Sequence, residues 1–325
     1  MHQSSEIMTP HSSARRQWIQ AAAATVLATS MGAWAQAPAR TLRIGHQKGV
    51  LSVLKSRGTL EKRLAPLNVS IKWTEFAAGP VQLEALNVGA IDFGDVGEAP
   101  PIFAQAAGAP LAYVAATVPR PAAEAVLVPK GSAVKTVADL RGKKIALNKG
   151  SNVHYFIVKL FEKAGLPYSD LNLVYLPPAD ARAAFEKGSV DAWVIWDPFL
   201  AAAEKTLEAR VLADATGVVG NRGYYFSSLD YVAKNQDVLN LVIDEINRID
   251  QWGAANKDAF GTELAGIWGL PKPVADASVG RQAFGTAPIT KAILAEQQQI
   301  ADTFFQLKLI PKKINLLEAA GAGIA

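Results

Sequence analysis

The chain has 325 residues, half of them hydrophobic, which is enough to bury one large core or the cores of two lobes. Its formal net charge of +4 suits the attraction of small anions but falls far short of the basic balance of a nucleic-acid-binding protein. The absence of cysteine excludes a thiol nucleophile, a disulfide and a thiolate metal site.

The beginning of the chain has the pattern of an export signal. Arg15-Arg16 precede a run of small apolar residues, 21–35, which ends in the A-x-A cleavage pattern Ala33-Trp34-Ala35. This run is shorter than the roughly 20 residues that a membrane span needs. The arginine pair fits a twin-arginine signal, and ordinary secretion stays open because an alanine precedes the pair where Ser or Thr is usual. We therefore expect a signal peptide, 1–35, and a mature chain that begins at Gln36.

The mature chain is expected in a periplasm. Without a cysteine it cannot carry a lipid on an N-terminal cysteine, so export would release it, and a released protein needs a bounded compartment. The leader removes two arginines and one glutamate, which leaves a formal charge of 31 − 28 = +3.

Common enzyme motifs are absent from the sequence. There is no Walker loop, no G-x-G-x-x-G, no G-x-S-x-G and no H-E-x-x-H. Of the four histidines only His46 and His154 remain after the leader, too few for a histidine metal cluster or a relay of several titrating groups. We therefore expect no catalytic residue, no metal and no cofactor, and a protein that is not an enzyme.

Strands and helices alternate along most of the mature chain. Residues 69–76 alternate apolar and polar side chains as a half-buried strand does, whereas 50–67 has a helical period broken near Gly58. The alternation predicts an α/β fold with mostly parallel sheets, followed by an almost wholly helical region, 236–309. The expected strands are 41–45, 69–76, 91–94, 111–118, 125–128, 144–147, 173–175, 191–196, 211–213 and 224–227, and the expected helices before the helical region are 50–67, 81–88, 99–107, 153–164, 178–187 and 198–209.

The clearest strand–loop–helix unit runs from Leu140 to Gly165. Apolar residues recur at helical spacing over 153–164, Ser151 or Asn152 can cap the helix, and Gly165 can end it. The N-terminus of this helix offers unpaired backbone N–H groups and a favourable dipole. The unit is therefore either part of an anion site or an ordinary capped turn.

Three other junctions place a glycine at the start of a helix. They lie at Gln47-Lys48-Gly49, at Gly79-Pro80-Val81 and at Gly97-Glu98-Ala99, each after a predicted strand. Ligands of open α/β sheets bind at the carboxyl ends of the strands. A micromolar site needs about 8 kcal/mol, whereas one helix end supplies at most ~2 kcal/mol and one charge-assisted hydrogen bond ~1.5–3 kcal/mol. Donors from several segments must therefore converge, which favours a cleft between two lobes.

Four segments resemble periplasmic substrate-binding proteins for aliphatic sulfonates. They are 85–108, 137–146, Pro178–Phe185 (PADARAAF) and Val190–Phe199 (VDAWVIWDPF). The resemblance covers nearly all of the mature chain, and the last two segments are its more specific part. The skeleton of strands and helices alone is shared with binders of taurine, nitrate and thiamine precursors.

The resemblance implies a two-lobed periplasmic binding protein fold of type II, each lobe with a mostly parallel sheet flanked by helices. Lobe one would comprise 41–128 and 229–325, and lobe two 129–228, with the ligand in the cleft between them. The implied partners are an organosulfonate and the membrane permease and ATPase of an ABC importer for sulfur uptake. We expect a monomer that binds no nucleic acid. A binder of taurine or nitrate stays open as an alternative, and an enzyme of the same fold is a less favoured one.

Backbone amides and hydroxyls at these loops hold the sulfonate in the family that the chain resembles. The chain departs from the family at 151–154, where relatives often have a run of serines before the histidine. Carried over, the resemblance implies ligand binding by Gln47, Gly79, Pro80, Val81, Gly97, Glu98, Ser151 and Asn152.

Four candidate ligand-binding residues each have two interpretations. Asp197 either caps the helix that follows Pro198 or faces the cleft, and we favour the cap. Trp196 either packs in the core or forms an apolar wall for an alkyl chain. His154 either donates to the anion or is a packed histidine. Glu98 would repel an anion unless it points away or meets a cationic group of the ligand, such as the ammonium of taurine.

Overall fold

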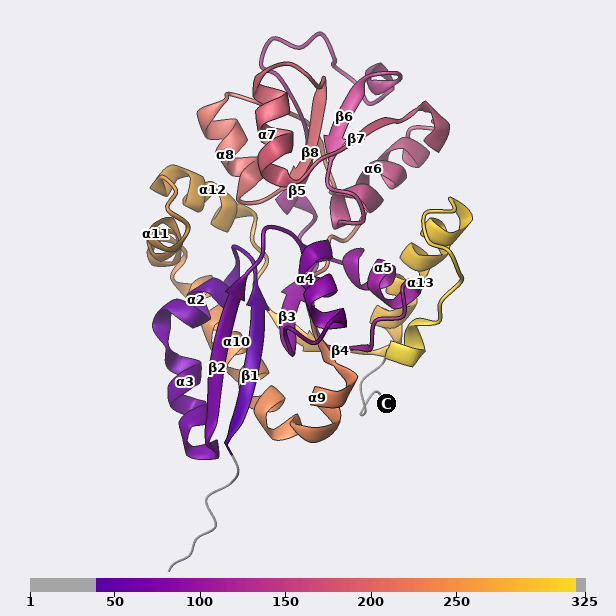
Figure 1. The fold of residues 1–325 in the computed structure, drawn as a ribbon. Coiled ribbons are helices and arrows are strands. Elements are labelled where there is room, and N and C mark those ends of the chain that lie inside the picture. The colour runs from indigo at the N-terminus through magenta and orange to yellow at the C-terminus, as the bar shows by residue number, and fades with distance from the viewer. Residues whose placement is uncertain (1–38, 320–325) are drawn as a thin grey trace, which may run out of the picture. The chain divides into compact units, whose positions relative to one another are not determined.

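The computed structural model describes residues 39–319 (Figure 1). The predicted signal peptide, 1–35, lies outside the described residues. Between residues 39 and 319, no helix is both long enough and apolar enough to cross a membrane.

The first of two sheets, sheet A, has six strands in the order β11-β4-β10-β3-β1-β2. β1 pairs in parallel with β2 and β3, whereas β10 is antiparallel to both β3 and β4, and β11 is antiparallel to β4. The strands are β1 (Arg40–His46), β2 (Val69–Glu75), β3 (Phe93–Val96), β4 (Leu111–Thr117), β10 (Tyr224–Ser228) and β11 (Thr286–Pro288).

The second sheet, sheet B, has five strands in the order β7-β6-β8-β5-β9. β6 pairs in parallel with β7 and β8, whereas β5 is antiparallel to both β8 and β9. The strands are β5 (Glu124–Val128), β6 (Lys144–Leu147), β7 (Asn172–Tyr175), β8 (Ala192–Trp196) and β9 (Arg210–Asp214).

Both sheets are mixed, so the prediction of mostly parallel sheets is wrong in this respect. Five of the nine strand pairings are antiparallel and four are parallel. Four of the five antiparallel pairings are made by the two strands at which the chain changes sheet, β5 and β10, because each enters its new sheet against the direction of its neighbours; the fifth is that of β11 with β4. Alternation of strands and helices reports the local βα units and carries no information about these crossings.

The crossings also affect the division into lobes. β5 belongs to sheet B and β10 to sheet A, whereas the lobes expected from the resemblance place 124–128 in lobe one and 224–228 in lobe two. The chain thus changes sheet before each of these strands. We propose lobe boundaries in the two connecting segments, 118–123 and 215–223.

Helices flank both sheets (Figure 1). The helical C-terminal region is as expected, except that it contains the short strand β11, which pairs at the edge of sheet A. The helices are α2 (Val50–Arg57), α3 (Thr59–Leu64), α4 (Gly79–Asn87), α5 (Pro100–Ala106), α6 (Asn152–Lys163), α7 (Pro178–Glu186), α8 (Phe199–Thr206), α9 (Leu229–Lys234), α10 (Gln236–Ala255), α11 (Lys257–Trp268), α12 (Lys272–Arg281) and α13 (Lys291–Gln306), with short 3-10 turns at Ala65–Leu67, Pro121–Ala123, Ala138–Leu140, Tyr168–Asp170 and Leu316–Ala319.

Two boundaries near the candidate site differ from the prediction. α4 begins at Gly79, two residues before the expected start, because Pro80 in the first turn has no N–H to leave unpaired and its fixed φ suits a helix. β3 ends at Val96 rather than at Gly94, so Asp95 lies on the strand and not in the loop after it.

Each sheet is covered on both faces. Along β10 the side chain of Tyr225 packs in one core cluster with α2 and α10, whereas Tyr224 and Phe226 pack in another with α4, α5 and α13. Along β8, the side chain of Val194 packs in one core cluster and that of Trp193 packs in another, on the opposite face of sheet B. Since the faces of the sheets are buried, a ligand can reach these strands only at their ends.

Candidate ligand-binding site

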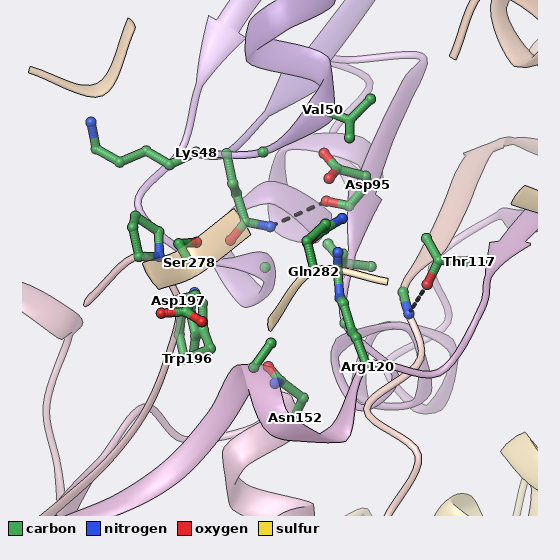
Figure 2. A pocket seen from close by; sticks show the side chains of 18 of the residues that line it. Lys48, Val50, Asp95, Thr117, Arg120, Asn152, Trp196, Asp197, Ser278 and Gln282 are labelled. Atoms are coloured by element: carbon green, nitrogen blue, oxygen red, sulfur yellow. Dashed lines mark hydrogen bonds between the residues drawn. The ribbon is translucent and has the colours of Figure 1, made fainter. Parts of the chain in front are cut away.

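A cavity of about 460 Å³ lies at the strand ends of both sheets. This volume is in the range of sites that enclose a small organic molecule, about 300–1,000 Å³. The lining is drawn from the loop after β1, the end of β3, both connecting segments between the sheets, the N-termini of α4 and α6, the β8–α8 junction and α10–α12 (Figure 2). Charged side chains in the lining are Lys48, Glu75, Asp95, Arg120, Asp197 and Asp250, and large apolar ones include Phe76, Trp196, Phe199, Tyr225, Phe260, Leu264 and Trp268.

Most of the residues proposed from the sequence meet at this cavity. The four that lie outside its lining are Pro80, Val81, Glu98 and His154. The seven that line it are Gln47, Gly79, Gly97, Ser151, Asn152, Trp196 and Asp197.

Two glycines allow the walls of the cavity to approach closely. A Cβ atom at Gly79 would lie 2.8 Å from Cγ of Pro100, so glycine is needed for the N-termini of α4 and α5 to come together. A Cβ atom at Gly97 would lie 3.0 Å from Asn152, so Gly97 lets the end of β3 approach the start of α6. Both contacts bring backbone N–H groups of separate segments to one cavity.

The start of α6 differs from a simple donor site. Ser151 occupies the N-cap position, but its Oγ donates to the Asn148 carbonyl at 2.7 Å and caps no N–H of the helix. Asn152 donates its side-chain N–H groups to Glu124 and, at 3.1 Å, to Asn221. These side-chain donors are therefore already used by the protein, and the donors that remain for a ligand at this place are backbone N–H groups of the first turn.

Asp197 has the capping role that we favoured. Its Oδ1 accepts from the backbone N–H of Ala201 at 3.0 Å, and both oxygens accept from the guanidinium of Arg281 at 2.8 and 2.9 Å. Burial raises the pKa of Asp197, and the hydrogen bonds from Arg281 oppose that shift. Asp197 also borders the cavity, but its charge there is balanced by Arg281.

Trp196 is half-buried at the end of β8 and borders the cavity. Its ring meets the ring of Phe199 edge-on, with 6.2 Å between centroids. The pair gives one wall of the cavity an apolar, aromatic surface.

Glu98 lies outside the lining of the cavity. The side chain is buried, and Oε2 accepts from the backbone N–H of Arg222 at 3.0 Å. Burial raises the pKa of Glu98 to about 7 and that of the neighbouring Glu124 well above its usual value. Pro80 and Val81 also lie outside the lining; both belong to the first turn of α4, and Val81 is exposed to solvent.

His154 is a packed histidine rather than an anion donor. Its side chain is fully buried, Nδ1 accepts from the backbone N–H of Gly150 at 3.3 Å, and its ring lies against Phe103, Tyr175 and Phe304. Burial lowers the pKa of His154 to about 4, so the ring is neutral at physiological pH.

Arg120 is the most important residue that the sequence analysis missed. Its guanidinium borders the cavity, and within residues 39–319 it makes neither an ion pair nor a hydrogen bond. The backbone holds it in place, since the N–H of Arg120 donates to Gly220 at 3.0 Å and its carbonyl accepts from Asn221 at 3.1 Å. Figure 2 shows the side chain extending into the space between the lining residues. The signal in the sequence is an arginine between two prolines, Pro119 and Pro121, in a connecting segment.

Asp95 and Asp250 were also missed. Both line the cavity, and each has one buried carboxyl oxygen, Oδ1, with no hydrogen-bond partner. Burial raises the pKa of Asp95 to about 6 and also raises that of Asp250. Throughout the part of the chain that the structure describes, no three His, Asp or Glu side chains are grouped as a metal site requires.

A model of a known protein family, described as NMT1/THI5 like, matches residues 66–256. This match spans more than half of the chain. The chain belongs to the NMT1/THI5-like family.

Three comparisons with similar proteins are instructive. The aliphatic sulfonates-binding protein of Escherichia coli (strain K12) is 42% identical over 305 residues, which are 93% of this chain and 95% of that protein. The crystal structure of the periplasmic aliphatic sulphonate binding protein SsuA from Escherichia coli gives a TM-score of 0.79 at 42% identity, covering 86% of this chain and 92% of that chain. The alkanesulfonate-binding protein SsuA from Xanthomonas axonopodis pv. citri, bound to MOPS, gives a TM-score of 0.82 at 41% identity, covering 87% and 98%.

These likenesses confirm the family and the two-lobed α/β fold that the sequence predicted. The two structural matches cover 86% and 87% of this chain, which includes the strands of both sheets and the cavity between them.

Proposed function

We propose that the protein is a periplasmic substrate-binding protein that captures aliphatic sulfonates and delivers them to the permease and ATPase of an ABC importer. The proposal is supported by the names of its relatives, which are sulfonate-binding proteins, and by the chemistry of the cavity. A sulfonate presents three acceptor oxygens and no proton near neutral pH, so its site needs donors.

The observation that carries the proposal is the unpaired guanidinium of Arg120 in the cavity. Arginine presents a planar fork of N–H donors that matches two oxygens of a tetrahedral anion. We propose that Arg120 holds the sulfonate together with backbone N–H groups at Gly79, Gly97 and the start of α6, and with Gln47 nearby. These groups come from separate segments, as the affinity argument requires.

The remaining lining suits an organic tail. Trp196, Phe199, Phe260, Leu264 and Trp268 offer apolar surface to it. Nitrate, the alternative on the same fold, has four atoms and would leave most of a 460 Å³ cavity unfilled. The cavity therefore favours an organosulfonate over nitrate.

We propose no catalytic role for this site. Ser151 and Ser278 are the serines in the lining; the hydroxyl of Ser151 donates to a backbone carbonyl and not to a base, and within residues 39–319 no hydrogen bond joins Ser278 to a base. His154, the nearest histidine in the sequence, is neutral and packed outside the lining. The usual pairing of a nucleophile with an adjacent base is thus missing from the lining. Incubation with alkanesulfonates should release no sulfite or sulfate, and release detected by ion chromatography would contradict this part of the proposal.

The direct test is a calorimetric panel with the purified protein. We expect butane-1-sulfonate and octane-1-sulfonate to bind at micromolar concentration or better, and sulfate and nitrate at least a hundredfold more weakly. Nitrate binding as tight as that of the sulfonates, or no sulfonate binding by folded protein, would overturn the proposed function.

Export and assembly complete the proposal. We propose that 1–35 is removed on export to the periplasm and that the mature protein is a monomer that binds no nucleic acid. Mass spectrometry of the exported protein should give a chain that starts at Gln36, and light scattering should give the mass of one chain.

A further inference from the structure

We propose that Asn221 and Gly223 are positioning residues, which hold the guanidinium of Arg120 in a fixed orientation relative to the start of α6 so that both can donate to one sulfonate. The inference rests on the proposed sulfonate-binding function and adds two residues that act through Arg120.

The two connecting segments between the sheets are hydrogen-bonded to each other at Arg120. Its backbone N–H donates to the Gly220 carbonyl at 3.0 Å, and its carbonyl accepts from Nδ2 of Asn221 at 3.1 Å. Both backbone polar groups of Arg120 are thus paired with the other connecting segment, 215–223. The base of the side chain therefore has a fixed place, and the direction of the guanidinium remains to be set.

Gly223 sets that direction, because it leaves room for the guanidinium. A Cβ atom at Gly223 would lie 3.0 Å from Nη2 of Arg120 and 3.1 Å from Cγ2 of Thr117, closer than side chains normally pack. The backbone N–H of Gly223 donates to Oγ1 of Thr117 at 2.8 Å, and Figure 2 shows this bond beside the Arg120 side chain. The φ of Gly223 is not in the left-handed region, so the backbone itself does not require glycine here. The guanidinium lies against the backbone of Gly223, and a larger residue would displace it.

Asn221 joins this arrangement to the start of α6. Its Oδ1 accepts from Nδ2 of Asn152, the first residue of α6, at 3.1 Å, while its own Nδ2 donates to Arg120. One side-chain amide thus connects the two groups that we propose as sulfonate donors. Asn221 is 4% exposed, and its φ of 46° lies in the left-handed region, which asparagine tolerates better than most other side chains.

Arg222 lies between these two residues and anchors them to sheet A. Its backbone N–H donates to Oε2 of Glu98 at 3.0 Å, and its Nη1 donates to the Thr117 carbonyl at 2.8 Å. Its Nη2 pairs with Glu296 at 3.0 Å. Arg222 lies outside the lining of the cavity, so its guanidinium holds the segment in place and Arg120 presents its donors to the cavity.

A planar guanidinium benefits from such positioning. Its fork matches two oxygens of a tetrahedral anion in one orientation, and an arginine that rotates freely loses side-chain entropy when the ligand binds. Residues that fix the fork in advance remove this cost. A displaced guanidinium should therefore bind sulfonate more weakly, even though every ligand donor is still present in the protein.

The first experiment measures the affinity of Gly223→Ala for butane-1-sulfonate by calorimetry. The added methyl group would crowd Nη2 of Arg120, so we expect a loss of at least tenfold. The matched control is Gly131→Ala, at an exposed glycine outside the cavity where the same methyl group would meet nothing within 4 Å. This control should bind within twofold of the unaltered protein.

The second variant, Asn221→Gly, keeps the left-handed backbone and removes both hydrogen bonds of the side chain. We expect a loss of at least fivefold. Its matched control is Asn68→Gly, because Asn68 has a similar φ of 54° and lies outside the cavity, and this control should bind as the unaltered protein does. If Asn221→Gly impairs folding, Gly223→Ala still tests the positioning, because it removes no side-chain hydrogen bond.

Combined variants separate positioning from a merely structural role. In protein that also carries Arg120→Ala, no guanidinium is left at this place to be positioned. Gly223→Ala should then cost less than twofold, and Asn221→Gly should cost less than it does in the unaltered protein. In protein that carries Trp196→Ala instead, which alters the proposed contact with the organic tail, the losses should add. A merely structural role would lower the affinity by the same factor in all three backgrounds.

Each contrary outcome has a separate meaning. If both variants bind within twofold of the unaltered protein, or if their losses add fully to that of Arg120→Ala, the positioning role is wrong and the sulfonate-binding function stands. If only one variant loses affinity, the role is wrong for the other residue. If the folded, unaltered protein binds no sulfonate, the proposed function is wrong and the positioning role falls with it.

Discussion

Arg120 lines the candidate site, whereas Arg281 lies behind it as the partner of the lining residue Asp197, and the surroundings of the two arginines are opposite. Arg281 of α12 donates to both oxygens of Asp197 and, at 2.8 Å, to Glu204. Arg120, in the segment between the two sheets, borders the cavity and has no such partner within residues 39–319. An arginine whose donors are all satisfied contributes to structure, whereas one held in place with free donors is prepared for a ligand.

Arg281, the paired arginine, joins two helices that are far apart in the chain. Asp197 precedes α8 and Glu204 lies within it, and α8 follows β8 of sheet B. Arg281 itself belongs to α12, in the helical C-terminal region. Beside the ion pairs, Ala201 and Ala202 of α8 pack against Val274 of α12. We infer that Arg281 holds the wall of the cavity in place and that Arg120 binds what enters it.

The largest expected effect is that of Arg120→Ala on sulfonate affinity. Two charge-assisted hydrogen bonds at ~1.5–3 kcal/mol each correspond to a loss of a hundredfold or more. Arg120→Lys should recover only part of the affinity, because an ammonium cannot form the planar, two-pronged contact. Calorimetry with butane-1-sulfonate measures both.

The matched control for Arg120 is Arg182→Ala, since Arg182 is a half-buried arginine of α7 outside the cavity that pairs with Glu186 and donates to Thr206 at 3.0 Å. This variant should bind as the unaltered protein does. An Arg120→Ala protein that binds within threefold of the unaltered protein would remove Arg120 from the ligand site.

Arg281→Ala should instead act on stability. It leaves Asp197, whose side chain is 7% exposed, without its counter-ion. Breaking a buried pair costs about 3–5 kcal/mol, and the partial exposure of Arg281 reduces this to about 2 kcal/mol. Thermal unfolding without ligand should show a lower Tm for Arg281→Ala than for Arg182→Ala. Unchanged stability together with a loss of affinity as large as that of Arg120→Ala would erase the distinction between the two arginines.

The contrast between the arginines also shows how far the sequence could lead. Strands and βα junctions follow from local periodicity and glycine positions, and these placed Gln47, Gly79, Gly97 and Asn152 at one cavity correctly. Such backbone donors belong to a local motif, so a local pattern can reveal them.

Arg120, Asp95 and Asp250 could not be found in that way. Arg120 lies in a crossing between sheets, and Asp250 lies on α10 in a region that periodicity identifies only as helical. Whether a charge remains unpaired in a cavity depends on which distant segments meet there. For the same reason the direction of β10 in sheet A, and the short strand β11, escaped the prediction.

The acids around Arg120 give a smaller effect, a pH dependence of sulfonate affinity. Burial raises the pKa of Asp95 to about 6 and that of Glu98 to about 7, and it also raises the pKa values of Asp250 and Glu124. Arg120 opposes each of these shifts, so a sulfonate bound to Arg120 should raise the pKa values further.

For butane-1-sulfonate, binding should therefore take up protons, and affinity should increase by several-fold as the pH falls from 8 to 5. Calorimetry at four pH values measures this slope, and an affinity that does not change between pH 8 and pH 5 would contradict a sulfonate bound to Arg120 beside these acids.

Ser151→Ala should have the smallest effect, although Ser151 borders the cavity at the start of α6. Its hydroxyl proton is directed to the Asn148 carbonyl at 2.7 Å, so the oxygen presents only lone pairs to an anion. We therefore expect less than a threefold change in sulfonate affinity and a stability loss of about 1 kcal/mol for the lost hydrogen bond. Ser189→Ala, at an exposed position outside the cavity, is the matched control for both measurements. A tenfold loss of affinity in Ser151→Ala alone would show that the hydroxyl turns to the ligand. Ser151 would then be a ligand-binding donor and not a structural one.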